Sequence, residues 1–489
     1  MVFKVSIIIS INYVFEITLK NLLAFYILKT ESIINMHVIK VKMMVNLSAF
    51  GMTIDVWIDM IKDGEKAILY GTLGGNQLIK KYTCQNGLRI VLENIPTVRS
   101  VAIGIWVGTG SRNETIENNG ISHFLEHMFF KGTKTRSSKE IAESFDSIGG
   151  QVNAFTSKEY TCFYAKVLDD HASFALDVLA DMFFNSTFDE EELKKEKNVV
   201  LEEIKMYEDT PDDIVHDLLS RASYGEHALG YPILGTEETL SNFNSHMLRE
   251  YIDQAYTPDN VVVSIAGNVS EDFMKEVESY FGSYKTTGTK PTYESPAFFN
   301  EKVTKKKDTE QAHLCLGFKG LQIGHQDIYS LIVLNNILGG SMSSRLFQDV
   351  REERGLAYSV FSYHSSHHDS GLLTVYAGTA SNQLNVLYET IEQTLERLKN
   401  EGITEKELHN SKEQMKGGLM LSLESTNSRM SRNGKNELML KRHRTLDEIL
   451  ESISAVKQES VYNMAQQIFS ANYSAALISP DGHLPTKLT

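Results

Sequence analysis

The sequence predicts an α+β protein made of two similar halves, each an antiparallel-rich sheet packed with helices. Three observations predict this class. Residues 79–108 alternate short β-rich runs with turns, stretches with helical spacing of apolar residues follow, and the order of strands and helices begins again after residue 309. At 489 residues the chain is also too long for one hydrophobic core, so at least two domains are expected.

The first sheet is predicted to begin with a hairpin. The β-rich runs 81–84 and 88–92 are separated by Asn86-Gly87, a pair that favours a tight turn between two strands. A third strand follows over 101–107. Residues 121–131 are then apolar on nearly every side, which is typical of a helix buried in a core.

The rest of the first half repeats these two kinds of pattern. The apolar spacing predicts helices over 137–148, 171–184 and 189–208, and strand character over 152–167 and 261–266. Gly149-Gly150 is a typical end for the first of these helices.

A linker is predicted between the halves. Residues 283–309 hold Pro291, Pro296 and a run of three lysines, with little apolar periodicity. A strand over 313–318, a helix over 329–338, a helix from 344, and strands from 357 and 372 follow it. The expected domains are an extension at 1–77, a first half at 78–285, a linker at 286–309 and a second half at 310–489.

The second half resembles the first closely enough to suggest one duplicated unit. Residues 332–339 roughly echo 123–132, and residues 355–360 echo 149–154. The ionisable residues differ, because His123, Glu126 and His127 of the first half are replaced in the second by Ile332, Asn335 and Asn336. Only the first half can therefore bind a catalytic metal.

Residues 1–77 have a different character from the rest. Residues 5–28 are apolar, but Glu16 and Lys20 interrupt them, and a charge at the centre of a spanning helix costs roughly 2.5–3.5 kcal/mol. We expect no stable membrane insertion, and no export signal is recognisable. Two interpretations stay open: a disordered extension, or a segment outside the natural protein, which would then start at Leu78.

Composition excludes some classes of function. The formal net charge of −15 opposes binding to nucleic acid, which needs clustered lysine and arginine. Cys84, Cys162 and Cys315 are far apart and odd in number, with no C-x-x-C spacing. They indicate reduced, buried thiols in a cytoplasmic location.

The segment from His123 to His127 predicts a metal site. The two histidines are four residues apart, so on a helix both imidazoles face one ion, with Glu126 one step away. Burying three ionisable groups in an apolar helix costs several kcal/mol unless they are paired or bound to a metal. We therefore interpret His123 and His127 as ligands and Glu126 as a general base, against the alternative of an accidental motif on a structural helix.

A hydrolytic zinc site usually has three protein ligands, so one more is needed. Glu196 and Glu203 are seven residues apart and share a face of the helix predicted over 189–208. The alternative is that both belong to a solvated acidic face. Spacing alone leaves the choice of ligand open.

Residues 123–133, His-Phe-Leu-Glu-His-Met-Phe-Phe-Lys-Gly-Thr, resemble the inverted zinc motif of the pitrilysin/insulinase superfamily, in its processing-peptidase branch. The resemblance runs over nearly all of residues 79–480. It implies one Zn²⁺ per chain and selects Glu203 as the third ligand. Glu196 matches a second acidic residue near the family's site and is expected to support catalysis without binding the metal.

The same resemblance implies a substrate site. Residues 150–157 are similar to the family's edge strand, to which a peptide adds as a further strand, so Asn153, Ala154 and Phe155 are expected to bind substrate. An ordinary internal strand would explain these residues equally well. Arg351 and Tyr358 match a pair that family members bring across to the zinc site to hold the substrate carbonyl. From sequence alone, a surface arginine and a core tyrosine would be the simpler interpretation.

The function implied is zinc-dependent endopeptidase activity on short unfolded peptides or processing segments. The resemblance also implies that the two halves face each other as a clamshell, that 78–285 is the catalytic domain, and that the protein is a homodimer. The alternative function is a non-catalytic peptide-binding or scaffold subunit of a larger complex.

A second group of histidines is a competing candidate for a metal site. His364, His367 and His368 lie close to Asp369, but no spacing directs all of them toward one ion. A solvated turn is the favoured interpretation.

Overall fold

The computed structural model describes residues 79–289 and 293–488 in full and, before them, the backbone of four strands. These strands are β1 (Lys4–Ser10), β2 (Val38–Leu47), β3 (Met52–Ile61) and β4 (Ile68–Thr72). They form one sheet in the order β1-β2-β3-β4. The chain divides into two compact units, Met1–Leu78 and Ile79–Thr489. Most of the apolar stretch 5–28 lies outside the described residues.

The first sheet of the larger unit has six strands. They are β5 (Lys80–Thr83), β6 (Arg89–Asn94), β7 (Ser100–Val107), β8 (Gln151–Thr156), β9 (Thr161–Leu168) and β10 (Val261–Gly267). Their order is β5-β6-β10-β7-β9-β8, which leaves β8 at an edge. The stretch 152–167, predicted as strand, is thus a hairpin of two strands.

The second sheet has the same topology. Its strands are β11 (Lys302–Lys306), β12 (Ala312–Lys319), β13 (Ala357–Ser366), β14 (Gly371–Thr379) and β15 (Ser474–Ser479), in the order β11-β15-β12-β14-β13. Without β5 the first sheet has the same order, and in both sheets only the pair formed by the first and last strands is parallel. The predicted duplication into two homologous halves is confirmed.

Part of the predicted linker is a strand. Lys302–Lys306 pairs with β15 as β11, at the edge of the second sheet. Three of its five residues are exposed, and four of the five are polar or charged. An edge strand of this composition carries no apolar signal, so residue patterns do not predict it.

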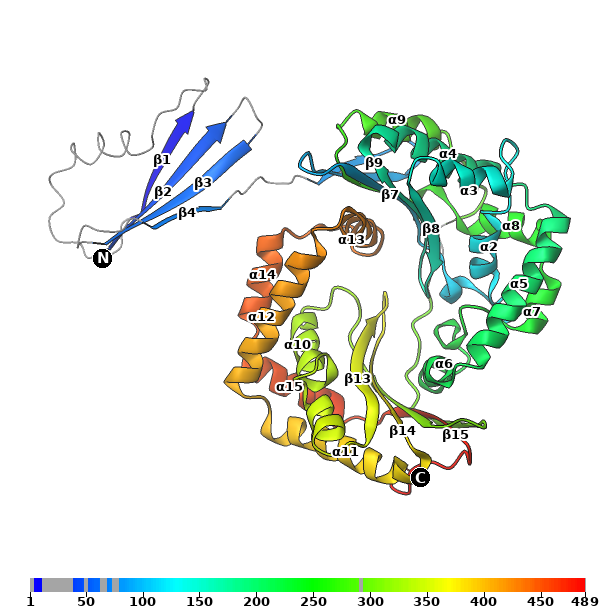
Figure 1. The fold of residues 1–489 in the computed structure, drawn as a ribbon, viewed down its shortest axis with the longest axis vertical. Coiled ribbons are helices and arrows are strands. Elements are labelled where there is room, and N and C mark those ends of the chain that lie inside the picture. The colour runs from blue at the N-terminus through cyan, green and yellow to red at the C-terminus, as the bar shows by residue number, and fades with distance from the viewer. Residues whose placement is uncertain are drawn as a thin grey trace. The chain divides into compact units, whose positions relative to one another are not determined.

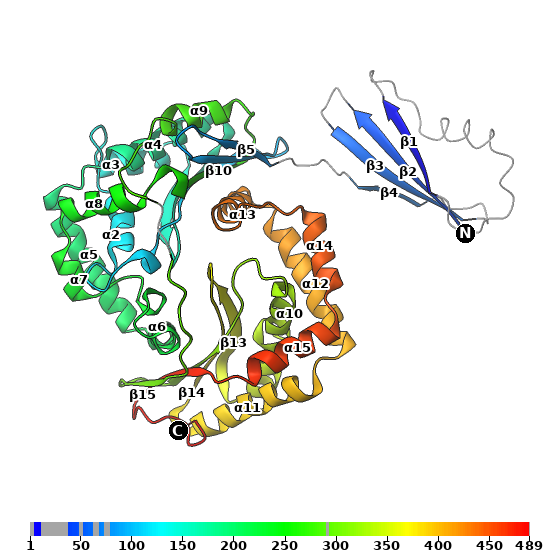
Figure 2. The ribbon, with the colours of Figure 1, turned by 180° about the vertical axis from the view of Figure 1, so that it is seen from behind.

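Helices cover the outer faces of both sheets (Figures 1 and 2). Around the first sheet they are α2 (Ile121–Met128), α3 (Ser138–Asp146), α4 (Ala172–Asn185), α5 (Glu190–Glu208), α7 (Glu237–Asn242), α8 (Ser245–Ala255) and α9 (Phe273–Phe281). Around the second they are α10 (Ile328–Gly339), α11 (Leu384–Glu401), α12 (Glu405–Ser422), α14 (Leu446–Ala455) and α15 (Gln458–Phe469). The helix expected from residue 344 is a short π-helical segment, Phe347–Glu352 (η6). Within this unit the halves form a clamshell, with each sheet facing the other half.

Two helices are exchanged between the halves. Helix α6 (Pro211–Tyr224) belongs to the first half in sequence but packs on β12 and β15 of the second sheet. Helix α13 (Thr426–Met439) belongs to the second half but packs on β7 and β10 of the first sheet. Its Met430 lies in one buried cluster with Trp106, whose Nε1 donates to the Met430 sulfur at 3.3 Å. Residues 79–489 are therefore one compact unit.

No helix among the described residues combines the length and apolar character needed to cross a membrane. The three cysteines are buried and free of disulfides. Burial raises the pKa of the Cys84 thiol to about 11.

The contact of α13 with the first sheet gives a stability prediction. A Cβ at Gly434 would lie 2.4 Å from Trp106 Nε1 and 2.5 Å from its Cδ1. Gly434→Ala should therefore lower the free energy of unfolding by about 1–3 kcal/mol, as overpacking does in well-packed cores. Urea unfolding measures this change.

Gly417→Ala in α12 is the matched control, because a Cβ there meets nothing within 4 Å. It should leave stability unchanged or raise it by about 0.5–1 kcal/mol, since alanine favours a helix interior over glycine. Equal stability of the two variants would contradict the packing described for α13.

Candidate metal centre

Helix α2 carries the central residues of the site, and a buried carboxylate holds its first turn. The helix starts after Gly120, whose φ of 94° places it in the left-handed region that suits glycine. Glu114 accepts hydrogen bonds from the backbone N–H groups of Gly120 at 2.7 Å and Ser122 at 2.9 Å. A carboxylate at the N-terminus satisfies free donors and complements the helix dipole. Burial raises the pKa of Glu114 despite these bonds.

Three possible metal ligands meet next to this helix. His123, His127 and Glu203 each offer one ligand atom, and these atoms lie within 4.8 Å of one another. Nε2 of His123 is 3.7 Å from Glu203 Oε1, and Nε2 of His127 is 3.4 Å from Glu203 Oε2. Donors bound at about 2.0–2.1 Å to one tetrahedral zinc lie about 3.4 Å apart. Two imidazole nitrogens and a carboxylate oxygen at this spacing fit zinc.

Glu196 sets the orientation of His127. Its Oε1 is 2.8 Å from Nδ1 of His127, and its Oε2 pairs with Lys131 Nζ at 2.6 Å. A hydrogen bond at Nδ1 leaves Nε2 free for a metal, the arrangement common among histidine ligands. Burial alone would raise the pKa of Glu196. The hydrogen bonds to His127 and Lys131 have the larger combined effect, so the pKa lies below its usual value.

The two histidines differ in their affinity for a proton. Burial and the neighbouring His127 lower the pKa of His123. Burial also lowers the pKa of His127, but hydrogen bonds to Glu196 and Glu203 outweigh this effect and raise it to about 9. Without a metal, a proton on His127 therefore offsets part of the negative charge, and a bound metal must displace it.

Glu126 lies beside the ligands and has a hydrogen-bond partner on β8. Thr156 Oγ1 donates to Glu126 Oε2 at 2.6 Å. Burial raises the pKa of Glu126, and the bond from Thr156 only partly offsets this. A carboxylate with a raised pKa is suited to accept and return a proton near neutral pH. Glu196, expected from the resemblance to support catalysis without binding the metal, contacts the candidate ligand His127.

The expected substrate residues lie on an edge strand close to Glu126. Asn153, Ala154 and Phe155 belong to β8, the last strand of the first sheet. Ala154 is buried in the core shared with α2, whereas Phe155 is 36% exposed and contacts Trp106 edge to face. The Ala154 N–H donates to the Asn153 side chain at 2.8 Å. Among the described strands, β8 pairs only with β9, so its other edge is open.

Arg351 and Tyr358 lie together in the second half. The guanidinium of Arg351 stacks 4.7 Å from the centre of the Tyr358 ring and 4.7 Å from that of Phe347. A β-bulge in β13 leaves Tyr358 without a partner in β14, and its side chain is 78% exposed. Among the contacts of the described residues, none joins this pair to the three ligands or to Glu126.

The second histidine group does not bring its ligand atoms close to one another. Among the described residues, the only cluster with ligand geometry is the one at α2 and α5. His368 is exposed, as a solvated turn predicts, but the turn also contacts the first half, because the His368 N–H donates to Glu159 at 3.0 Å and His367 Nδ1 lies 3.7 Å from the same carboxylate. The turn packs on the first half, a contact that local sequence spacing cannot reveal.

Two residues of the site were not anticipated from the sequence. Thr156 lies in the strand predicted to bind substrate. Because side chains alternate along a strand, Thr156 is on the opposite face to Phe155, and this alternation was the signal that could have placed it near Glu126. Glu114 comes before the helix and resembles any exposed loop acid. Its contact with the N–H groups of Gly120 and Ser122 depends on how the chain folds between residues 114 and 120, which the residue type does not indicate.

The cluster gives a metal-binding prediction. Glu203→Gln should reduce zinc bound per chain from one to well below one, because the neutral amide is a poor ligand. Glu126→Gln should keep one zinc, since this side chain is not among the three donors. Elemental analysis of the purified full chain after dialysis measures both.

Glu202→Gln is the matched control, because Glu202 is exposed and pairs with Lys205 on another face of α5. It should retain one zinc per chain. Full zinc content in Glu203→Gln would contradict the ligand set.

Family models match two parts of the chain. Residues 89–237 match the model described as insulinase (peptidase family M16), and residues 242–415 match the model described as the peptidase M16 inactive domain. The first range contains α2, β8 and α5. The second contains Arg351 and Tyr358.

Solved structures have the same fold. The crystal structure of a protease from Helicobacter pylori has a TM-score of 0.78 at 24% identity, over 83% of this chain and all of that one. A peptidase M16 inactive domain from Pseudomonas fluorescens also has a TM-score of 0.78, at 18% identity, over 83% of this chain and 99% of the other.

Curated relatives are more similar in sequence. The chain is 72% identical over 409 residues, 84% of its length, to the whole of the "Uncharacterized zinc protease YmxG" of Bacillus subtilis. It is 41% identical over 399 residues, 81% of its length, to 96% of an "Uncharacterized zinc protease" of Rickettsia felis. With a matching family model and relatives this similar, the chain belongs to the insulinase family of zinc proteases, peptidase family M16, and its cofactor is zinc.

Proposed function

We propose that the protein is a zinc metalloendopeptidase that cleaves short unfolded peptides or processing segments. The observation that carries this proposal is the position of Glu126. Its carboxylate is held by Thr156 on a half-paired edge strand, next to three donors that fit zinc. Ligands, base and a place for an extended peptide are thus adjacent.

The proposed reaction is hydrolysis with Glu126 as the general base. Bound zinc would supply Lewis acidity to the attacking water and the scissile carbonyl. Glu126 takes a proton from the water and then donates it to the leaving amine. The orientation of the ligand His127 by Glu196 keeps the donor set in place while this proton moves.

An extended peptide would bind by pairing with β8. The free edge offers backbone groups that bind a main chain without demanding a particular sequence. In this structure the Ala154 N–H donates to the Asn153 side chain. A bound peptide would displace the Asn153 amide, and the Ala154 N–H would then donate to a substrate carbonyl. Phe155, partly exposed on the other face of the strand, would contact substrate side chains.

Arg351 and Tyr358 would complete the site from the second half. The phenol is exposed and the guanidinium stacks on it, so both are available to hold a carbonyl oxygen as negative charge develops. The pair has no contact with the ligands in this structure, so we propose that substrate binding draws the halves closer.

A pocket at the C-terminal end of α5, which Tyr358 also lines, suggests a preference for basic peptides. It has a volume of about 750 Å³ and lies where α5 leads into α6, six residues beyond Glu203, or about 9 Å along a helix axis. Five carboxylates line it, together with aromatic rings, against one lysine; the acids are Asp209, Asp212, Asp213, Asp308 and Glu310. Acidic and aromatic groups together favour a cationic side chain.

A non-catalytic peptide-binding or scaffold subunit is the alternative function. Such a protein needs no general base beside its metal, so the hydrogen bond that holds Glu126 to Thr156 favours the catalytic function. A wild-type chain that binds one zinc and an extended peptide, but cleaves none, would favour this alternative.

We also propose that the protein is a homodimer located in the cytoplasm. The dimer rests on the family resemblance, and light scattering would give a mass near twice 55.1 kDa. The location is supported by three buried cysteines that form no disulfide.

The mechanism predicts the effect of replacing the base. Glu126→Gln should lower the turnover of a quenched fluorescent peptide by roughly 10²–10⁴-fold, because an amide cannot accept the proton. Glu202→Gln should retain wild-type turnover. Wild-type activity in Glu126→Gln would contradict the proposed mechanism.

The pocket predicts a preference that depends on charge. A peptide with arginine should be cleaved roughly tenfold more efficiently than the same peptide with citrulline, since only arginine can form charged hydrogen bonds with the acids. Asp213→Asn should reduce this ratio, whereas Asp170→Asn, at an exposed site elsewhere, should not. Equal ratios in all three proteins would rule the pocket out as the source of the preference.

A further inference from the structure

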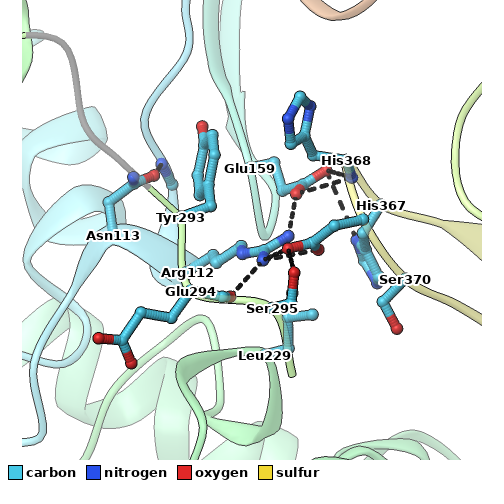
Figure 3. Close-up of polar contacts among 12 residues, drawn as sticks. Arg112, Asn113, Glu159, Leu229, Tyr293, Glu294, Ser295, His367, His368 and Ser370 are labelled. Atoms are coloured by element: carbon cyan, nitrogen blue, oxygen red, sulfur yellow. Dashed lines mark hydrogen bonds and ion pairs between the residues drawn. The ribbon is translucent and has the colours of Figure 1, made fainter. Parts of the chain in front are cut away.

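A buried guanidinium lies where the two halves meet. Arg112, in the short segment Ser111–Asn113 (η2), has a side chain that is 1% exposed. Its Nη1 is 2.6 Å from Glu159 Oε1 and its Nη2 is 2.7 Å from Asp369 Oδ1. Figure 3 shows the labelled residues gathered around this side chain.

Four segments far apart in sequence supply the cluster. Arg112 precedes α2, Glu159 lies in the turn between β8 and β9, and Asp369 lies in the turn between β13 and β14 of the second half. Residues 293–295 pass between them: the Tyr293 ring lies 4.7 Å from the guanidinium carbon, and the Glu294 carbonyl accepts from Nη2 at 2.9 Å.

The second half contributes more than one contact. The Asp369 carboxylate accepts from Arg112 at 2.8 Å and from Ser295 Oγ at 3.0 Å. The His368 N–H donates to both oxygens of Glu159, at 3.0 and 3.1 Å. Removing one partner of a buried ion pair leaves an uncompensated charge and is strongly destabilising. The loss of any one of these contacts is therefore expected to shift the segments that carry them.

One side of the cluster leads to α2. Glu114, two residues after Arg112, is the carboxylate that binds the N–H groups of Gly120 and Ser122. Arg112 thus holds the start of the segment that leads into α2, and Glu114, two residues later, is bonded to the first turn of the helix itself. A shift of Arg112 would move the first turn of the helix that carries Glu126.

The other side leads to β8. Glu159 follows Thr156 by three residues, and Thr156 is the hydrogen-bond partner of Glu126. The backbones are also joined, because the Arg112 N–H donates to the Lys158 carbonyl at 2.7 Å. The cluster thus connects to both segments that hold the base.

We propose that the Arg112 cluster is a positioning joint through which the second half sets the geometry of Glu126. Asp369 and the His368 backbone fix Arg112 and Glu159, and these in turn fix the start of α2 and the end of β8. Arg112, Glu159 and Asp369 are positioning residues, since none touches the reacting atoms. The inference rests on the proposed peptidase function.

Asp369→Asn in the full chain tests the joint. It preserves the size of the side chain but removes the charge facing Arg112. We expect kcat for a quenched peptide to fall by roughly tenfold to a hundredfold, because small misplacements of catalytic groups cost rates of that order. KM should stay within about twofold and zinc at one per chain, because β8 and the ligands remain.

Hydrogen exchange of the substrate-free chain is the second readout. Asp369→Asn should speed exchange at residues 119–128 and 151–160, far from the substitution in sequence. Asp170→Asn, which removes an exposed partner of Arg99, is the matched control and should leave kinetics and exchange unchanged. Should Asp369→Asn fail to fold, Ser295→Ala, which removes one hydroxyl donor, takes its place with a smaller effect in the same direction.

The outcomes separate the two claims. Faster exchange confined to the turn at 367–370, or an unchanged kcat in a folded variant, would overturn the joint. A fall in zinc content would also overturn it, because the substitution would then act on the ligands. A wild-type chain that cleaves no peptide would refute the proposed function, while the exchange data would still decide whether the second half is coupled to α2 and β8.

Discussion

The structure depends on how helix α2 carries ionisable groups inside an apolar core. Phe124, Leu125 and Met128 are fully buried around its histidines and glutamate, and each ionisable group there needs a partner to offset its desolvation. The partners come from other elements: α5 supplies carboxylates to the histidines, and β8 supplies a hydroxyl to Glu126. This requirement accounts for the polar contacts among α2, α5 and β8, and the same arrangement brings the three candidate zinc ligands together.

Duplication gives both halves the same framework, but among the described residues only the first half carries a cluster of candidate metal ligands. Both sheets have the same strand order, and α10 occupies in the second half the place of α2 in the first. At that place α10 has buried Leu331 and Leu334 and no pair of histidines. The exchange of α6 and α13 joins the two copies into one unit, and the Arg112 cluster adds a polar contact at the same boundary. In the proposed mechanism the second half contributes Arg351 and Tyr358 to the site and also positions Glu126 through the Arg112 cluster.

The sequence was sufficient for features encoded locally. The apolar helix around His123, the helix with Glu196 and Glu203, and the strand with Phe155 all appear where their patterns place them. The exchange of helices was not predictable, because periodicity shows that a helix has an apolar face but not which sheet covers it. The Arg112 cluster joins residues far apart in sequence, so no local pattern encodes it. Tyr358 is exposed by a bulge, which its residue type does not indicate.

The central claim is that zinc binds between α2 and α5 with Glu126 beside it but not bound. Anomalous diffraction at the zinc edge, from crystals of the full chain grown with zinc, tests this most directly. The account predicts one strong peak per chain, within about 2.0–2.2 Å of Nε2 of His123, Nε2 of His127 and a carboxylate oxygen of Glu203. A peak coordinated by Glu126, or one at a different set of residues, would contradict it.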